Sequence, residues 1–97
     1  MVDLSELTDF NFQGENFKKN QIILVETKRN FKDYIKSLKY RYNKKNPYLP
    51  NYLINKEGEI FLIMKPEKFS KFMMSEDIDS NSIIISLENF GWLKKIL

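Results

Sequence analysis

The sequence predicts an α/β domain with a mixed central sheet and flanking helices. Residues 22–25 and 83–85 are uninterrupted apolar runs, which are typical of strands covered on both faces. Between them lie a segment with apolar residues at helical spacing and a hairpin pattern around residues 55–58. The resulting order of strand, helix, hairpin, short helix and strand indicates a mixed sheet with helices on both faces.

The first half of the chain is predicted to hold a strand and a long helix. Residues 1–20 are polar, and we expect them to form an arm or short helix lying on a domain of residues 21–97. Residues 21–27 form the first strand. Asn30 then caps a helix whose apolar positions recur at helical spacing. These positions are Phe31, Tyr34, Ile35, Leu38 and Tyr42.

The intervening Lys32, Lys36 and Lys39 are expected in solvent. A loop follows over residues 43–50, because two X-Pro pairs interrupt regular structure there.

The second half is predicted to hold a hairpin, a short helix and a buried strand. Residues 52–54 and 59–64 flank a turn in which Gly58 supplies a positive φ. Pro66 and Glu67 are typical of the first turn of a helix, which we expect to extend to Phe72. We expect a polar loop over 75–81 and a strand over 82–88. Only one long helix is predicted, so the second face of the sheet needs a cover from residues 1–20 or from chain beyond Leu97.

The composition excludes several kinds of active site. The chain has 97 residues, a formal net charge of +3, no Cys and no His. It therefore cannot form a disulfide, a Cys–His or Ser–His pair, or an ordinary zinc site from its own side chains. The positive charge favours polyanionic partners such as nucleic acid, anionic lipid or cell-wall polymers, although it also serves solubility.

No apolar run in the sequence is long enough to span a membrane. The acidic N-terminus lacks the basic start and apolar block of a signal peptide. We therefore expect a protein made in the cytoplasm.

Two segments carry a resemblance to a known family. They are Asn51-Tyr-Leu-Ile-Asn-Lys-Glu-Gly-Glu-Ile-Phe-Leu-Ile63 and Asn81-Ser-Ile-Ile-Ile-Ser-Leu-Glu-Asn89. With the preceding strand and helix, they resemble zinc-dependent N-acetylmuramoyl-L-alanine amidases of the phage lysozyme and peptidoglycan-recognition type. The resemblance covers residues 20–92, and Phe90-Gly-Trp-Leu93 resembles variants from phages of AT-rich hosts. It implies an endolysin-like, phage-encoded domain that acts on or binds bacterial cell-wall peptidoglycan, which it would reach on lysis.

The positions that match the family's zinc ligands carry other residues. The first zinc His of the family ends the first strand, where this chain has Val25-Glu26-Thr27. The hairpin position that often carries His is Asn51, the preceding family Tyr is Pro50, and the loop His falls near Met73-Met74. The remaining ligands come from a C-terminal half that would begin after Leu97. The resemblance therefore implies a truncated, catalytically incomplete domain, and whether it is an enzyme stays open.

Carboxylates are the candidate metal ligands that remain, and the weak candidates are Glu26 and Glu88. They end two predicted core strands, where ligand crevices often form, and such a pair suits Mg²⁺ or Ca²⁺ better than Zn²⁺. The alternative is two strand-end glutamates that are solvated or paired with Lys28 or Lys94. The acidic run at 76–79 lacks the Gly and distal Glu of a calcium loop. We expect no metal cofactor in this chain, whereas the family it resembles uses zinc.

A retained family groove would bind peptidoglycan or a muropeptide through a small set of polar and aromatic residues. Aromatic rings stack on sugar faces, and amides and carboxylates form hydrogen bonds with peptides and hydroxyl groups. The candidates are Asn51, Tyr52, Glu88, Asn89 and Trp92. Trp92 could equally fill the core.

Two other kinds of partner are compatible with the sequence. Residues 40–48 interleave Tyr with Lys and Arg, which is the composition of a surface for single-stranded nucleic acid, although no named motif is present and Lys is also favoured near a helix end. A small protein-interaction module is a further alternative. Strands 22–27 and 82–88 would promote aggregation if left uncovered, so we also expect self-association or a missing C-terminal half.

Overall fold

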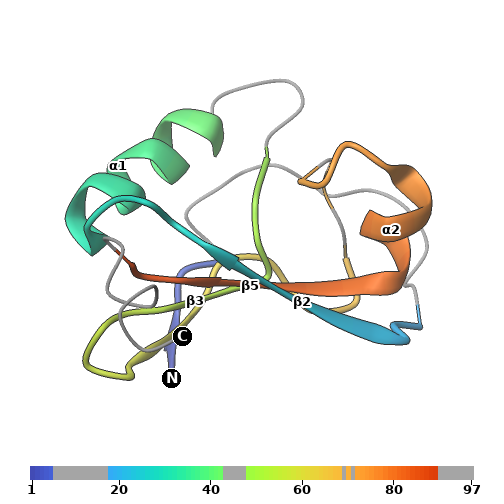
Figure 1. The fold of residues 1–97 in the computed structure, drawn as a ribbon, viewed down its shortest axis with the longest axis horizontal. Helices are drawn as coiled ribbons and strands as arrows, with labels where there is room; N and C mark the ends of the chain where they lie inside the picture. Colours follow the sequence, from blue (N-terminus) through green and yellow to red (C-terminus); the bar gives the residue numbers. More distant parts are fainter. Residues whose placement is uncertain (6–17, 43–47, 69, 71, 90–97) are drawn as a thin grey trace.

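The computed structural model describes residues 1–5, 18–42, 48–68, 70 and 72–89, which form a five-stranded mixed sheet with two helices above one face (Figure 1). In chain order the elements are β1 (Val2–Asp3), β2 (Gln21–Glu26), α1 (Phe31–Tyr42), β3 (Tyr52–Ile54), β4 (Ile60–Leu62), α2 (Glu76–Asn81) and β5 (Ser82–Leu87). The predicted α/β class and mixed sheet are confirmed.

The sheet has the order β1-β4-β3-β5-β2, so the two most apolar strands lie side by side. β5 runs parallel to both β2 and β3, whereas β3 and β4 form the antiparallel hairpin. The first residues of the expected arm are a sheet strand, because β1 pairs with β4. Residues 6–17 of that arm lie outside the described residues. The fold therefore contains three adjacent parallel strands whose carboxyl ends share one edge.

Helix α1 covers the core as its apolar spacing predicts. The Asn30 side chain caps the helix by accepting a hydrogen bond from the Asp33 N–H (2.8 Å). The Phe31 ring meets that of Phe61 with centroids 4.6 Å apart. The buried core cluster consists of Tyr34, Leu38, Leu49, Leu53, Phe61 and Ile63. Tyr42 is the last of the apolar positions predicted for this helix, and its side chain is not among those that the structure describes.

The hairpin turn is held by one side chain. Asn55 Oδ1 accepts hydrogen bonds from the backbone N–H groups of Glu57 (3.1 Å) and Glu59 (2.8 Å). Gly58 has a φ of 84°, which confirms the predicted positive φ and explains why glycine stands there.

The helix predicted for residues 66–72 is wrong, and the helix of this region is α2. Pro66 and Glu67 form only a turn, which is closed by a hydrogen bond from the Lys68 N–H to the Lys65 carbonyl (3.0 Å). The carbonyls of Lys65 and Lys68 also accept hydrogen bonds from the Asn51 side chain. Residues 76–81, predicted as a loop, form α2 instead. Its cap is Ser75, which accepts a hydrogen bond from the Ile78 N–H, and acidic residues in the first turn favour the helix start.

The two faces of the sheet are covered differently. Ser86 Oγ lies 2.9 Å from the hydroxyl of Tyr34, so the face that carries Ser82, Ile84 and Ser86 packs under the helices. Alternation and strand register assign the opposite set of side chains to the other face, which we call the second face. Its members are Ile22, Leu24, Glu26, Tyr52, Ile54, Ile60, Leu62, Ile83, Ile85 and Leu87.

Helices on both faces of the sheet were expected, but within the described residues both helices lie on one face (Figure 1). The prediction that β2 is buried on both faces is also wrong. β2 is an edge strand, and Ile22 and Leu24 are 63% and 62% exposed. An uninterrupted apolar run reports hydrophobicity and not position within a sheet, so it cannot distinguish a central strand from an edge strand.

Candidate functional site

Polar residues gather where the three parallel strands end. Thr27 follows β2, Asn55 follows β3, and Glu88 and Asn89 follow β5. Crevices at the carboxyl ends of parallel strands are a common position for ligand sites in α/β proteins. The geometry at this edge therefore decides whether these side chains can contact a ligand.

The Glu88 carboxylate forms hydrogen bonds with the backbone. It is 5% exposed, and its two oxygens accept hydrogen bonds from the N–H groups of Phe31 (2.5 Å) and Lys56 (2.9 Å). Phe31 is the first residue of α1, where a negative charge is favoured by the unpaired N–H groups and the helix dipole. Glu88 thus joins the start of α1 to the turn of the hairpin, and it fills the position that an anionic ligand of α1 would take.

Thr27 and Asn89 close the same corner from the other side. The Thr27 hydroxyl donates to the carbonyl of Arg29 (2.6 Å) and accepts from the backbone N–H of Asn89 (3.3 Å). Both residues are buried, and Asn89 is 0% exposed. Glu88 and Asn89, predicted to line a groove, are therefore neighbours that stabilise the end of β5 from inside the protein.

Glu26 and Glu88 do not form a pair. Glu26 lies beside Leu87 in the register of β2 and β5, so its side chain points to the second face, whereas Glu88 is one residue further along and points the other way. In the described parts of the chain, no group of three Asp or Glu side chains is arranged to hold a metal ion. The carboxylate pair considered from the sequence therefore has no geometric basis.

Asn51 lies at the other end of the strands, within the fold. It is 1% exposed. Its Oδ1 accepts from the N–H of Ile84 (2.8 Å), and its Nδ2 donates to the carbonyls of Lys65 (3.0 Å) and Lys68 (3.2 Å). Asn51 lies beside Ile84 of β5, whereas Asn89 follows the end of that strand, so the two residues are roughly 17 Å apart at about 3.3 Å per residue. The groove predicted from Asn51 to Asn89 is therefore not one site.

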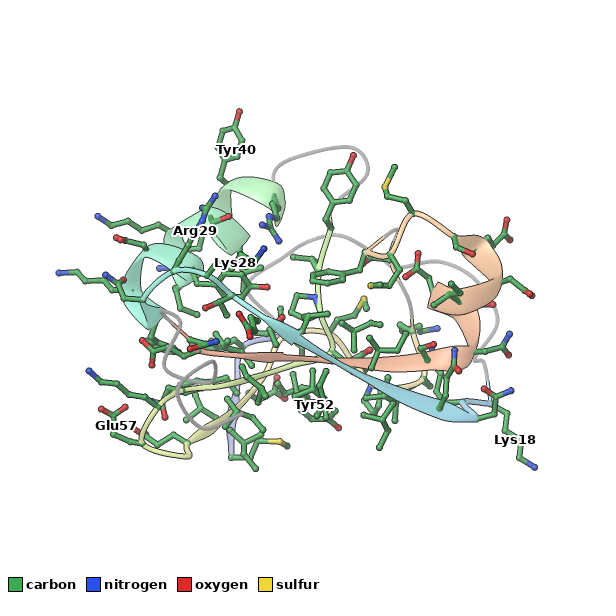
Figure 2. All side chains as sticks on the ribbon, in the orientation of Figure 1. Lys18, Lys28, Arg29, Tyr40, Tyr52 and Glu57 are labelled. Carbon is green, nitrogen blue, oxygen red and sulfur yellow. The ribbon has the colours of Figure 1, made fainter. Side chains whose placement is uncertain are left out.

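Tyr52 is the one predicted binding residue that is partly exposed in the described part of the chain. It lies on the second face, in a row with Ile85 of β5 and Leu24 of β2. Figure 2 shows Tyr52 on the side of the sheet away from α1. Glu26 shares this face and is half-buried. Trp92 lies outside the described residues.

Asp79 forms a buried polar cluster that the sequence did not indicate. It is 1% exposed, and its Oδ1 accepts from the N–H of Met73 (2.8 Å), whereas its Oδ2 accepts no hydrogen bond from the described residues. Lys19 Nζ donates to the carbonyls of Lys68 (3.1 Å) and Asp79 (3.4 Å). Burial lowers the pKa of Lys19, and the nearby negative charges of Asp79 and Glu67 oppose that shift. The cluster anchors the segment between β4 and α2.

A basic surface runs along the outer side of α1. Its members are all exposed, and they are Lys28, Arg29, Lys32, Lys36 and Lys39. Figure 2 shows Lys28 and Arg29 beside α1 and Tyr40 at its far end. Arg41 is held in place, since its guanidinium donates to the carbonyl of Tyr48 (3.0 Å) and lies 5.6 Å from the centre of the Tyr34 ring. Residues 43–47 of the predicted nucleic-acid surface lie outside the described residues.

In the described residues, no helix has the length and apolar character needed to cross a membrane. Searches against protein-family models, curated proteins and solved structures gave no match to this chain.

Proposed function

We propose that the chain is an N-acetylmuramoyl-L-alanine amidase-like domain that binds bacterial cell-wall peptidoglycan without cleaving it. The observation that carries this proposal is the adjacency of the segments in the resemblance. The first strand, the hairpin and the Asn-Ser-Ile strand are β2, β3–β4 and β5, which are neighbours in one sheet. Segments that bind a common ligand need such proximity.

The second face offers the chemistry that a muropeptide needs. Of the residues that match the family's first zinc ligand, Glu26 points to this face and Val25 to the helices. Tyr52 lies on the same face two strands away and level with Leu24, so it is about 12 Å from Glu26. The Tyr52 ring can stack on a sugar, the Glu26 carboxylate can accept hydrogen bonds from hydroxyl or amide groups, and Leu24 and Ile85 between them can contact acetyl and lactyl methyl groups.

The residues do not fit the zinc that the family uses. The chain has no His and no Cys. The Glu88 oxygens accept backbone hydrogen bonds, and Glu26 points to the other face. We therefore infer binding, and we derive no hydrolytic step for this chain.

Replacing Tyr52 with alanine tests the proposed binding face. We expect a soluble muropeptide to bind the Tyr52→Ala variant about fivefold more weakly than the wild type, because a lost aromatic stack is worth about 1 kcal/mol. Titration followed by intrinsic fluorescence or NMR would measure the affinity. The matched control is Tyr40→Ala, which removes a 65% exposed ring from α1 and should leave the affinity unchanged.

Thermal melting of both variants verifies that each one is folded. Equal affinities of Tyr52→Ala and the wild type, or no binding of muropeptide by the folded wild type, would contradict the proposal.

The basic surface of α1 favours a second candidate, which is binding of single-stranded nucleic acid. The basic surface has five exposed cationic side chains, and α1 contains a single acidic residue, Asp33. The surface therefore carries a net positive charge. Phosphate contacts of this kind release counterions, so the affinity falls steeply with salt. Uncharged stacking on Tyr52 would depend on salt much less, which separates the two candidates.

A further inference from the structure

We propose that β2 is a self-association edge, through which two copies of the chain pair antiparallel about a two-fold axis and form one continuous sheet. The axis stands perpendicular to the sheet, so the second faces of both copies lie on the same side. This inference does not depend on the proposed function.

β2 lacks the features that protect an edge strand. It is the last strand in the sheet order, and among the described residues it pairs with β5 alone. Its six residues contain no Pro and no Lys, and it pairs residue for residue with β5 without a bulge. Edge strands of natural proteins usually contain a Pro, a Lys or a bulge, because an open and regular edge strand pairs with strands of other molecules. The 63% and 62% exposure of Ile22 and Leu24 adds apolar surface at this edge.

The backbone groups available on β2 can be assigned from its pairing with β5. The N–H of Thr27 donates to the carbonyl of Leu87 (3.0 Å). In a parallel pair, alternate residues direct both of their backbone groups to the same neighbour, so the odd-numbered residues of β2 bond to β5. Ile22, Leu24 and Glu26 therefore direct their N–H and C=O groups to the free edge.

The sequence of β2 selects one register for pairing with itself. An axis at Ile23 places Ile22 of each copy opposite Leu24 of the other, and these residues exchange about four backbone hydrogen bonds. Apolar side chains then face apolar side chains, and Glu26 lies opposite Asn20. An axis at Leu24 would instead place Ile22 opposite Glu26. Because cross-strand pairs of like character stabilise a sheet, the Ile23-centred register is favoured.

Charge at the ends of β2 supports the antiparallel arrangement. Lys18 is exposed and lies just before the start of β2, where Figure 2 shows it extending from the sheet. Glu26 is the last residue of the strand. An antiparallel partner with its axis at Ile23 places Glu26 of each copy opposite Asn20 of the other, two residues from Lys18, and places Lys18 itself opposite Lys28. A parallel partner would align every charged residue of the strand with its own copy.

The oligomeric state of the wild type and of a charged variant tests the proposal. Sedimentation velocity over a range of concentrations should show a closed dimer for the wild type, and Leu24→Lys should weaken dimerisation more than tenfold. The matched control is Ile60→Lys, because Ile60 is 42% exposed on the same face but lies on β4, away from the β2 edge. A monomeric wild type, open-ended oligomers, or equal effects of the two variants would overturn the proposal.

The absence of Cys from the chain allows a direct test of the register. Across the axis, the two copies of Ile23 form a pair without hydrogen bonds, with Cα atoms about 4.5 Å apart, which is within disulfide range. Under mild oxidation, Ile23→Cys should form a covalent dimer. In Leu24→Cys the Cα atoms would be about 8 Å apart, so it should stay largely uncrosslinked. Preferential crosslinking of Leu24→Cys would contradict the proposed pairing.

Discussion

Replacing Asn51 with leucine is expected to lower the free energy of unfolding by about 3 kcal/mol, because it removes several buried hydrogen bonds at once. The N–H of Ile84 loses its acceptor, and the carbonyls of Lys65 and Lys68 each lose one of their two donors. Ile84 lies in β5, and Lys65 and Lys68 lie in the segment after β4. The substitution therefore uncouples that segment from the sheet. For a domain of this size the melting temperature should fall by roughly 12–24 °C.

Chemical denaturation followed by circular dichroism measures this effect. The matched control is Asn81→Ala, since the Asn81 side chain donates an exposed hydrogen bond to the carbonyl of Asp77 (2.8 Å). That variant should lose less than about 1 kcal/mol. Asn51→Asp separates packing from hydrogen bonding, because it keeps the acceptor for Ile84 but directs a carboxylate oxygen at two carbonyls. It should be at least as unstable as Asn51→Leu at neutral pH. Wild-type stability in either Asn51 variant would contradict the structural role.

Replacing Glu88 with alanine should also cost about 3 kcal/mol, because the buried carboxylate accepts two backbone hydrogen bonds. The expected loss is local to the first turn of α1 and the hairpin turn, so amide exchange at Phe31 and Lys56 should accelerate more than exchange within β5. Glu88→Gln should be intermediate, since its amide oxygen can accept one of these bonds while its NH₂ group opposes the other donor.

Glu57→Ala is the matched control, because Glu57 is an exposed glutamate in the same hairpin turn. It should leave both stability and exchange unchanged. If Glu88→Ala were as stable as the wild type, its carboxylate would not be structural. The assignment of Glu88 to the interior of the protein, and not to a binding surface, would then be wrong.

Local patterns predicted the parts of the fold that depend on local physics. The Asn30 cap and the spacing of Tyr34 and Leu38 predicted α1 correctly, because the residues that start an amphipathic helix and form its apolar face all lie within one short segment. The turn at Gly58 was predictable for the same reason, since positive φ favours glycine. The apolar runs identified β2 and β5 as strands, but the edge position of β2 depends on the whole sheet.

The candidate site was less predictable, because tertiary hydrogen bonds decide it. Asn51 and Glu88 are residue types that often bind ligands, and only the fold reveals that their polar atoms bind the backbone. The helix predicted at 66–72 is a second example, since the turn found at Pro66 and Glu67 is attached to the distant Asn51 side chain through the carbonyls of Lys65 and Lys68. Asp79 was hidden in an acidic segment. The sequence pattern that could have indicated its burial is Ser75 as the cap of a helix, which places Asp79 within the helix and not in a loop.

Co-sedimentation of the purified chain with peptidoglycan sacculi at low and high salt tests whether the chain binds peptidoglycan without cleaving it. The pellet is assayed for the chain, and the supernatant is assayed for newly freed L-alanine amino groups. We expect the chain to sediment with sacculi at both salt concentrations and to release no amino groups. Absence from the pellet, or binding that disappears at high salt, would contradict wall recognition and favour the basic surface of α1 as the functional one. Release of amino groups would contradict the inference that this chain binds without cleaving.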